Sequence, residues 1–390
     1  MSATDILVRG AGPVGLVAAL SLSRLGLRVG LAGAASPPAG PDSAAAAEVD
    51  VRAYALNPAS VRLLQSLKVW DALPADARTA VQEMHVEGDA PGAVIDFSAW
   101  TLGIDALAWI VDAAELERAL QAAVRFAPGV VELAGSETAD RQAEGATLQV
   151  LAEGRDSAAR ERLHIQTRRH AYGQQGIAAR LLSPQPHANL ARQWFRSPDV
   201  LALLPLDRPA FEGRTGHGLG LVWSVPDEQA DTLLALSDAA FTDALMDATG
   251  GAAGPLTLVG LRASWPLSMA RADAVHGPGW VLVGDAAHVV HPLAGQGLNL
   301  GFADVAALAD VISERQADEA WRPLSDPRLL SRYARRRRVP TAAMSQMTDG
   351  LLQLFASPAP WARELRNRGL TLVNHLQPLK RLLTSRALGT

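Results

Sequence analysis

Apolar and polar residues near the N-terminus follow the pattern of a strand, a helix and a second strand. Residues 5–10 form a short apolar run that ends in glycine, which predicts a buried parallel strand. Pro13 suits the first turn of a helix, the apolar residues after it recur at helical spacing, and Gly26 is placed to end the helix. A second apolar run at 27–32 completes a strand–helix–strand unit.

The rest of the chain predicts two sheets whose strands are interleaved along the sequence. A helix is expected at 113–126 and a helical insert at 227–249, while a buried-strand pattern at 280–284 and a helical pattern at 298–313 return to the first sheet. The other strand-like runs are 81–87, 93–97, 107–111, 130–151, 174–183, 200–206, 218–225 and 256–269. The predicted fold class is therefore α/β, with a Rossmann-like dinucleotide domain interleaved with a β-sheet substrate domain.

Three glycines stand in the first strand-to-helix turn. Gly10, Gly12 and Gly15 have G-x-G-x-x-G spacing, with Pro13 and Val14 between the last two. This spacing lets a backbone approach a pyrophosphate at a helix N-terminus. The alternative is a tight turn that binds no ligand.

The acidic residue that commonly binds a ribose after such a turn is missing. It is expected at the end of the second strand, near Gly33, but no Asp or Glu occurs between Asp5 and Asp42. We therefore expect this ribose contact to come from backbone, water or another side chain.

A longer motif lies near residue 290. It reads Gly-Asp-Ala-Ala-His at 284–288 and His-Pro-Leu-Ala-Gly-Gln-Gly-Leu-Asn-Leu-Gly at 291–301. With the glycine turn, it closely resembles the FAD-dependent aromatic hydroxylases of the para-hydroxybenzoate hydroxylase fold, in the branch of the 2-polyprenylphenol hydroxylases of ubiquinone biosynthesis. The resemblance runs nearly end to end, with further matches at 50–57, 172–176, 192–195, 202–206, 221–226, 351–355 and 365–388.

The resemblance and the interleaved strands together predict the domain boundaries. An FAD-binding domain in three parts alternates with a substrate domain in two parts, and C-terminal helices follow. The predicted parts are 1–80, 111–170 and 276–330 for FAD binding, 81–110 and 171–275 for the substrate domain, and 331–390 for a basic C-terminal helical segment.

The family's cofactor contacts imply roles for matching positions in this chain. Asp285 corresponds to the Asp that holds the ribityl chain of FAD, since a carboxylate accepts hydrogen bonds from sugar hydroxyls; a turn or N-cap carboxylate is the alternative. The loop after it is expected against the flavin ring, where helix N–H groups favour negative charge. The loop residues implied are Pro292, Gly295 and Gln296 nearest the ring, then Gly297, Leu298 and Asn299.

Two further positions resemble cofactor contacts of the family. Arg52 matches an arginine beside the cofactor, and the alternative is an ion pair with Asp50 or Glu48. Glu153 stands where the usual Asp-Gly signature has Asp, in the stretch 152–160. Its extra methylene moves the carboxylate by more than about 1 Å, which disturbs a positioned contact; a purely structural turn is the alternative.

The resemblance implies chemistry that the flavin performs, with no side chain assigned a catalytic role. NADPH or NADH would reduce FAD, dioxygen would add at flavin C4a, and an electron-rich phenol would attack the terminal oxygen of the C4a-hydroperoxide. Water has to be excluded from this site. We therefore expect apolar cover over the ring from Trp194, Leu203, Leu204 and Trp223.

The amino-acid composition limits which binding partners and which cellular location are expected. In 390 residues, 48% are hydrophobic and 19% charged, with a net charge of −4, which describes a globular protein without the basic excess of a nucleic-acid binder. There is no cysteine, signal segment or long apolar run, so we expect a cytoplasmic protein. His288 and His291 have no third ligand at matching spacing, so no metal is expected.

Charge is distributed unevenly along the chain. Residues 331–390 hold eleven Lys or Arg and two acidic residues, a net charge of +9, which leaves −13 for the first 330 residues. A basic amphipathic segment suits peripheral contact with anionic lipid or with a ubiquinone-biosynthesis complex. The alternative is a helix pair that packs on the acidic body with its charges solvated.

The leading hypothesis is an FAD-dependent monooxygenase that hydroxylates the ring of a polyprenylated phenol in ubiquinone biosynthesis. Its substrates would be this hydrophobic aromatic compound and dioxygen. A hydroxylase of another aromatic compound is the runner-up. A non-catalytic paralogue that serves as a scaffold is suggested by the departures at Gly33 and Glu153. A plain NAD(P) dehydrogenase would leave the motif at 284–301 unexplained.

Overall fold

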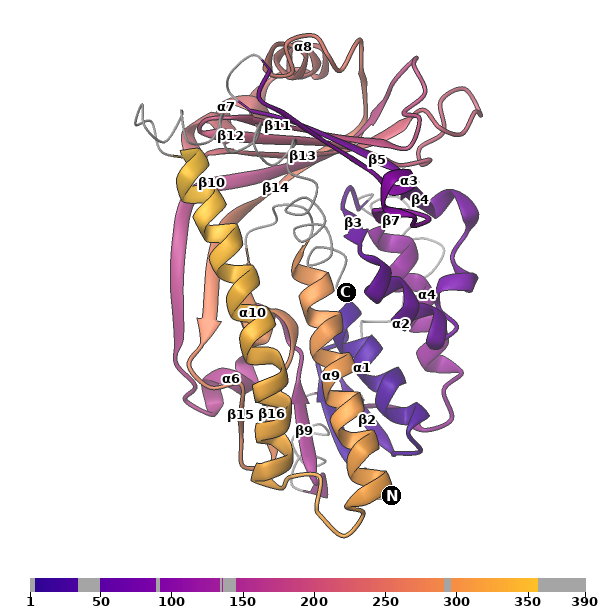
Figure 1. Ribbon diagram of the computed structural model, residues 1–390, viewed down its shortest axis with the longest axis vertical. Helices are drawn as coiled ribbons and strands as arrows, with labels where there is room; N and C mark the ends of the chain where they lie inside the picture. The colour runs from indigo at the N-terminus through magenta and orange to yellow at the C-terminus, as the bar shows by residue number, and fades with distance from the viewer. Residues whose placement is uncertain are drawn as a thin grey trace.

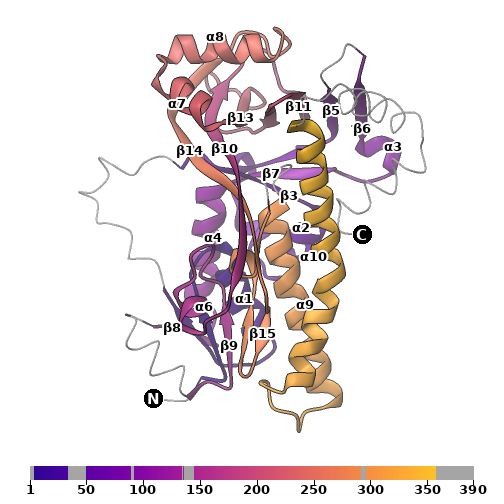
Figure 2. The same ribbon diagram turned by 90° about the vertical axis from the view of Figure 1, so that its left-hand side faces the viewer.

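The computed structural model describes residues 4–33, 50–88, 92–133, 135, 145–290 and 296–356. Within these ranges the chain forms a six-stranded, an eight-stranded and a three-stranded sheet together with α-helices. Figures 1 and 2 show an elongated molecule with the six-stranded sheet toward one end and the eight-stranded sheet toward the other. The predicted fold class, a Rossmann-like part interleaved with a β-sheet part and followed by a C-terminal helix, is confirmed.

The six-stranded sheet contains the N-terminal strand–helix–strand unit. Its order is β15-β16-β9-β1-β2-β8, and the five strands from β16 to β8 run parallel. Every residue of β1 and β2 is buried, as expected for parallel strands covered on both faces. The bounds are β1 (Ile6–Arg9), β2 (Val29–Ala32), β8 (Val130–Leu133), β9 (Leu148–Leu151), β15 (His276–Gly277) and β16 (Trp280–Leu282).

Four helices build the main core around this sheet. Buried side chains of α1 and α4 pack with those of α9 and with β1, and α2 packs against α9. Pro13 occupies the first turn of α1, as predicted, and the Asn57 side chain caps α2 by accepting from the Ser60 N–H. The bounds are α1 (Pro13–Arg24), α2 (Pro58–Ser66), α4 (Ala113–Arg125) and α9 (Gln296–Asp318).

The eight-stranded sheet has two faces with different cover. Its order is β17-β14-β10-β13-β12-β11-β5-β6. Helices α7 (Asp227–Ala235) and α8 (Asp238–Ala248) pack on the outer face, and the inner face looks toward the six-stranded sheet (Figure 1). The strands are β5 (Glu83–Glu87), β6 (Val94–Ser98), β10 (Thr167–Leu182), β11 (Leu190–Arg196), β12 (Asp199–Pro205), β13 (Gly218–Pro226), β14 (Thr257–Ala272) and β17 (His288–Val289).

Two long strands connect the ends of the molecule. β10 and β14 each have 16 residues and pair antiparallel from Thr167 opposite Ala272 to Leu182 opposite Thr257. They extend beyond the predicted runs at 174–183 and 256–269 because their lower halves continue as a two-stranded ribbon past a register shift between Ala171 and Gln175. This exposed ribbon carries polar residues, so the apolar pattern along the sequence did not predict its full length.

The three-stranded sheet lies between the two larger ones. Its order is β3-β7-β4, with β3 (Ala53–Leu56), β4 (Arg78–Val81) and β7 (Ala108–Asp112) antiparallel. A small core joins β3 and β7 to Leu204 and Leu206 of the eight-stranded sheet region. The remaining short elements are η2 (Trp70–Ala72), η3 (Ala75–Ala77), α3 (Ala99–Leu102), α6 (Ala158–Arg162) and η4 (Gly284–Ala286).

The C-terminal helix α10 (Pro327–Ala356) runs beside α9 (Figures 1 and 2). The predicted basic segment at 331–390 thus begins inside α10, and its part beyond residue 356, including the expected helix at 365–388, lies outside the described residues. No helix in the described ranges is both long and apolar enough to cross a bilayer.

Candidate functional site

The first glycine turn packs so tightly that two of its glycines cannot be replaced without displacement. A Cβ on Gly10, whose φ is +109°, would lie 2.2 Å from the Ala152 carbonyl oxygen, and one on Gly15 would lie 1.8 Å from the Gly10 oxygen. Within the described ranges, a Cβ on Gly12, the N-cap of α1, would have no neighbour within 4 Å, and no side chain caps this helix. The turn therefore offers free backbone N–H groups and room at a helix N-terminus, which suits a phosphate group.

The second glycine motif meets the first across a single side chain. A Cβ on Gly284 would lie 3.1 Å from Val14 Cγ1, and a Cβ on Gly301 would lie 2.6 Å from Val14 Cγ2. Val14 therefore packs between α9 and the η4 turn, at the start of α1. This contact brings together two motifs that are some 270 residues apart along the chain.

Asp285 carries the carboxylate that the sequence assigned to the cofactor. It sits in η4 and is half-buried, and among the described residues no donor lies within hydrogen-bond distance of its carboxylate. Burial raises the pKa of Asp285, against the opposing charges of His288 and Arg155. A partly desolvated carboxylate without a partner fits a sugar-like chain that brings its own hydroxyl donors.

The loop expected against the flavin ring is described only from Gln296, where α9 begins. Pro292 and Gly295 lie outside the described residues. Among the described residues no atom lies within 4 Å of a Cβ built on Gly297, and Leu298 packs against the main core.

The Asn299 side chain makes its hydrogen bonds within the protein. Its Oδ1 accepts from the Asn57 N–H at 2.9 Å and from the Ser60 hydroxyl at 2.7 Å, and its Nδ2 donates to the Ala55 carbonyl at 2.7 Å. The side chain is 5% exposed. Asn299 therefore fixes β3 and α2 to the start of α9, and its predicted contact with the cofactor would have to come from its backbone.

Arg52 forms the ion pair that was the alternative to a cofactor contact. Its guanidinium binds both oxygens of Asp50, with Nη2 to Oδ2 at 2.7 Å, and reaches Glu117 at 3.3 Å. These carboxylates raise the pKa of Arg52, chiefly through the hydrogen bonds to Asp50. The side chain stays 41% exposed, so these ion pairs do not enclose it.

Glu153 caps a short helix. Its Oε2 accepts from the Ser157 hydroxyl at 2.6 Å and from the Ala159 N–H at 2.8 Å, at the start of α6. In the same stretch the buried Arg160 donates from Nη1 to the Ala286 carbonyl at 2.9 Å. The segment 152–160 therefore supports the η4 turn next to Asp285, and the structure favours the turn over a direct cofactor contact for Glu153.

Three of the four expected pocket residues lie on the wrong face of the sheet. Trp194, Leu203 and Trp223 are 0–2% exposed and belong to the core beneath α7 and α8, where Trp223 lies 6.1 Å from Phe241 between ring centroids. Only Leu204 points to the inner face, where it packs with Ala53 of β3 and its neighbours. The expectation of a pocket lining is corrected for these three residues.

The alternation of side chains along the strands identifies the inner face instead. In antiparallel pairs the partners point to the same side, so the residues opposite Leu204 and its neighbours share its face. Most are small or apolar, and Trp265 keeps 40% of its surface exposed. These residues are Gly176, Ala178, Arg180, Val200, Ala202, Leu204, Gly220, Val222, Ser224, Ala263 and Trp265.

A buried charged cluster that no sequence motif indicates lies behind η4. The Asp304 carboxylate, 1% exposed, binds His288 Nε2 at 2.7 Å and Arg337 Nε at 2.6 Å. Burial lowers the pKa of His288, but Asp304 outweighs burial and the net change is upward. Burial raises the pKa of Asp304, but His288 and Arg337 lower it by more, so the net change is downward. In the described part of the chain no three His, Asp or Glu side chains are grouped to hold a metal.

Comparisons with known proteins agree with this architecture. A family model described as an FAD binding domain matches residues 3–348. The chain is 31% identical to ubiquinone hydroxylase UbiL of Rhodospirillum rubrum, over 99% of this chain and 90% of that protein. It is also 31% identical to the 3-demethoxyubiquinol 3-hydroxylase of Escherichia coli, over 99% of this chain and 98% of that protein.

Solved structures share the fold at lower identity. PqsL, a probable FAD-dependent monooxygenase from Pseudomonas aeruginosa, superposes with a TM-score of 0.73 at 21% identity, covering 95% of this chain and 100% of that one. The p-nitrophenol 4-monooxygenase PnpA from Pseudomonas putida gives a TM-score of 0.71 at 16% identity, covering 99% and 98%. The chain therefore belongs to the FAD-binding-domain family and is an FAD-dependent aromatic monooxygenase.

Proposed function

We propose that this monooxygenase hydroxylates the ring of a polyprenylated phenol in ubiquinone biosynthesis, with NADPH or NADH as the reductant. The observation that carries the proposal is similarity along nearly the whole chain to two proteins named as ubiquinone hydroxylases. An inner sheet face of small and apolar side chains supports it, because a prenylated ring is a large apolar ligand.

The chain's own groups have binding roles in this proposal. FAD, when bound, supplies the electrons and the activation of dioxygen. The open N-terminus of α1 at Gly12 would hold the pyrophosphate, and Asp285 would accept hydrogen bonds from the ribityl hydroxyls. Gln296 and Gly297, at the start of α9, would lie beside the ring, whose negative charge after reduction is favoured by the helix N-terminus.

The substrate would lie between the start of α9 and the inner face of the eight-stranded sheet. Leu204, Val222 and Trp265 offer apolar surface there, while Arg180 on the same face is 4% exposed and donates to the Arg52 carbonyl and to Asp112. Such a surface excludes water from the reacting ring. Excluding water directs the activated oxygen to the phenol and away from release as hydrogen peroxide.

A matched pair of substitutions tests this placement. Leu204→Ala, on the inner face, should raise KM for a short-tailed polyprenylphenol by about three- to tenfold and increase hydrogen peroxide release, since losing one or two buried methylene contacts costs about 0.7–1.4 kcal/mol. Leu203→Ala, on the outer face, should lower stability by about 2–5 kcal/mol with little change in KM. Steady-state kinetics with peroxide detection and urea unfolding measure both. The reverse pattern would contradict the assignment of faces.

The reaction itself is tested by isotopically labelled dioxygen. Purified protein with FAD, NADPH or NADH and a short-tailed polyprenylphenol should yield a product that gains one labelled oxygen atom, detected by mass spectrometry. Turnover of other simple phenols but not of the prenylated one would favour the runner-up, a hydroxylase of another aromatic compound. Failure to bind FAD would favour the scaffold.

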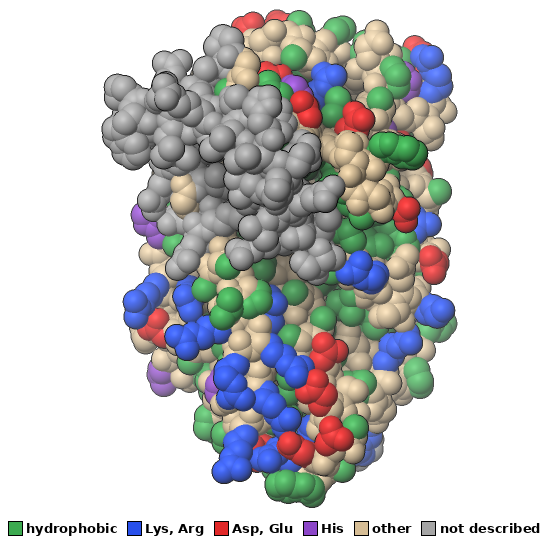
Figure 3. Space-filling view, in the orientation of Figure 1, with side chains coloured by type: hydrophobic (Ala, Val, Ile, Leu, Met, Phe, Trp, Pro, Cys, Tyr) green, Lys and Arg blue, Asp and Glu red, His purple; other side chains and the backbone are tan. Residues whose placement is uncertain are grey.

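The basic C-terminal segment is proposed to work at a lipid surface on the cytoplasmic side. Arg332, Arg336 and Arg337 of this segment pair with carboxylates of the protein, whereas Arg335 and Arg338 are exposed and would face anionic headgroups. Figure 3 shows basic side chains gathered over the lower part of α10 with acidic ones beside them. Sedimentation with vesicles rich in anionic lipid, against neutral vesicles, tests this contact.

A further inference from the structure

The C-terminal helix contacts the polypeptide immediately around the Asp285 turn. Tyr333 and Arg337 lie one turn apart on α10, so they share a face. The Tyr333 hydroxyl donates to the Leu282 carbonyl at 2.7 Å, at the end of β16. Arg337 Nε donates to Asp304 Oδ1 at 2.6 Å. Both contacts are made with the layer just behind η4.

Asp304 transmits this contact to the turn. Its Oδ2 accepts from the Gly284 N–H at 2.9 Å and from His288 Nε2 at 2.7 Å. Gly284 directly precedes Asp285, and His288 follows it by three residues. One buried carboxylate therefore holds both ends of the segment that presents Asp285.

Arg337 is distinguished from its neighbours in the arginine run. Arg335, Arg336 and Arg338 are exposed, and Arg336 makes an exposed ion pair with Glu314 at 2.7 Å, with side chains 40% and 44% exposed. Arg337 is only 12% exposed in its pair with Asp304. A buried carboxylate that loses one cation is left partly uncompensated, so Arg337 has a larger effect than a surface arginine.

We propose that Arg337 is a positioning residue of the FAD site, which acts through Asp304 on the Gly284–Ala286 turn and hence on the Asp285 carboxylate. This inference rests on the proposed role of Asp285 toward FAD. It gives one residue of the basic C-terminal segment a function inside the protein. The other arginines of the run remain available at the surface.

The test compares FAD affinity in the full-length protein, measured by titrating apoprotein with FAD and following flavin fluorescence. Arg337→Met should raise the dissociation constant by about tenfold or more, the usual effect of removing a support of a binding group. Arg337→Lys, which keeps the charge, should recover part of this loss. Arg336→Met, the matched control, should change the dissociation constant less than about twofold.

A double-mutant cycle separates positioning from general destabilisation. In an Asp285→Ala background, Arg337→Met should weaken FAD binding by less than about twofold further, because its target is gone. Equal losses with and without Asp285, or no loss from Arg337→Met alone, would overturn the inference. If Asp285→Ala itself binds FAD like the wild type, the proposed role of Asp285 fails instead.

Folding of the variants is checked independently of FAD. Circular dichroism and thermal unfolding of each apoprotein show whether the native fold is retained. Should Arg337→Met not fold, the same cycle is run with Arg337→Lys, whose smaller loss of FAD affinity must also disappear in the Asp285→Ala background. If Arg337→Lys lost as much FAD affinity in the Asp285→Ala background as in the wild type, positioning through Asp285 would be contradicted.

Discussion

The burial of the Asp285 carboxylate has opposite effects on folding stability and on ligand binding. In the protein without ligand, burial raises its pKa and no described group donates a hydrogen bond to it. Such a carboxylate destabilises the folded chain while it is ionised. The same desolvation strengthens hydrogen bonds that a ligand's hydroxyls would donate to it.

The burial of this carboxylate predicts opposite effects of Asp285→Asn on stability and on FAD binding. A folded-state pKa above the unfolded value means that the charged carboxylate costs stability at neutral pH, and that this cost fades as pH falls through the raised pKa. Asp285→Asn should therefore stabilise the apoprotein by about 1 kcal/mol at pH 8 and by less at pH 5. Urea unfolding of apoprotein at both pH values measures this. A loss of stability at pH 8 would contradict the account.

FAD affinity of the same variant gives the second half of this prediction. An amide accepts hydrogen bonds less strongly than a carboxylate, so Asp285→Asn should weaken FAD binding by about tenfold. Unchanged affinity would show that Asp285 does not hold the cofactor.

Single residues differ in how well the sequence predicted them. The close packing of Gly10 and Gly15 was predictable because the glycine spacing marks a turn where backbone segments approach each other, whereas the role of Asp285 toward FAD stays a prediction. The partners of Arg52 and Asn299 were less predictable, since Glu117 and Ala55 lie 65 and 244 residues away along the chain. Asp304 and Arg337 carry no motif spacing, and only the packing of α10 on α9 brings them together.

At the level of elements, Val14 joins α1, η4 and α9. A Cβ on Gly301 would lie 2.6 Å from Val14 Cγ2, whereas one on Gly12 would have no neighbour within 4 Å. The two glycines therefore serve different purposes within one site: Gly301 permits close packing, and Gly12 keeps space open.

Substitution of these glycines should separate stability from binding. Gly301→Ala should destabilise the apoprotein by about 1–3 kcal/mol through overpacking, and Val14→Ala added to it should restore part of that loss. Gly12→Ala should change stability by less than about 1 kcal/mol and still weaken FAD binding, because its methyl group fills the proposed phosphate cradle. Thermal unfolding and FAD titration check both. Equal loss of stability in the two glycine variants would disprove the distinction.

The strands of the eight-stranded sheet show why the pocket was misplaced. Both faces of this sheet are covered, so Leu203 and Leu204 are both apolar and the sequence contains no alternation to tell them apart. Large aromatic residues such as Trp194 and Trp223 suggested a pocket, yet they fill the wider gap beneath α7 and α8. The positions of the strands were predictable because runs of β-branched and apolar residues indicate a strand whichever face of the sheet its side chains point to.

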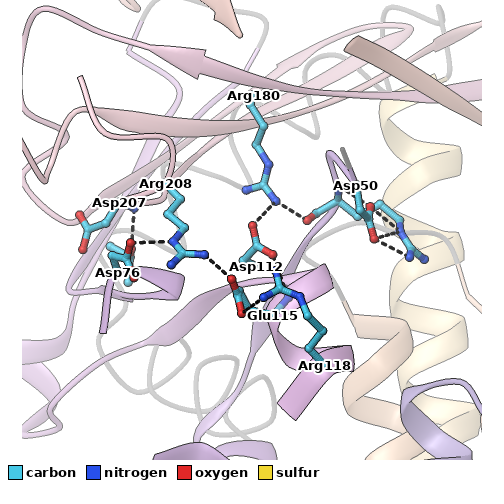
Figure 4. Close-up of polar contacts among 10 residues, drawn as sticks. Asp50, Asp76, Asp112, Glu115, Arg118, Arg180, Asp207 and Arg208 are labelled. Atoms are coloured by element: carbon cyan, nitrogen blue, oxygen red, sulfur yellow. Dashed lines mark hydrogen bonds and ion pairs between the residues drawn. The ribbon is translucent and has the colours of Figure 1, made fainter. Parts of the chain in front are cut away.

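At the scale of the whole molecule, two arginines of the substrate sheet region hold it to the FAD-binding part (Figure 4). Arg180 of β10, 4% exposed, donates to the Arg52 carbonyl at 2.5 Å and to Asp112 at 3.1 Å. Arg208 pairs with Asp76 at 2.6 Å and with Glu115. Asp112 and Glu115 stand at the start of α4, so these contacts join the substrate sheet region to the N-terminal end of that helix.

Loss of the Arg180 contact should loosen this arrangement. Asp112→Asn leaves a buried guanidinium unpaired while Asn still caps α4, so we expect a loss of about 3 kcal/mol in unfolding free energy. Arg180→Met combined with Asp112→Asn should recover much of it, because no buried charge remains. Urea unfolding of the single and double variants tests this. Additive losses would show that the two residues act independently.

We expect FAD held at Asp285 to face a site for a prenylated phenol under the inner sheet face. The most direct measurement is the anaerobic reduction of protein-bound flavin by NADPH or NADH, followed by its visible absorbance, with and without a short-tailed polyprenylphenol. The account predicts bound flavin whose reduction is faster when the phenol is present. Two results would contradict this expectation: folded protein that stays colourless in excess FAD, or bound flavin that is reduced at the same rate with and without the phenol.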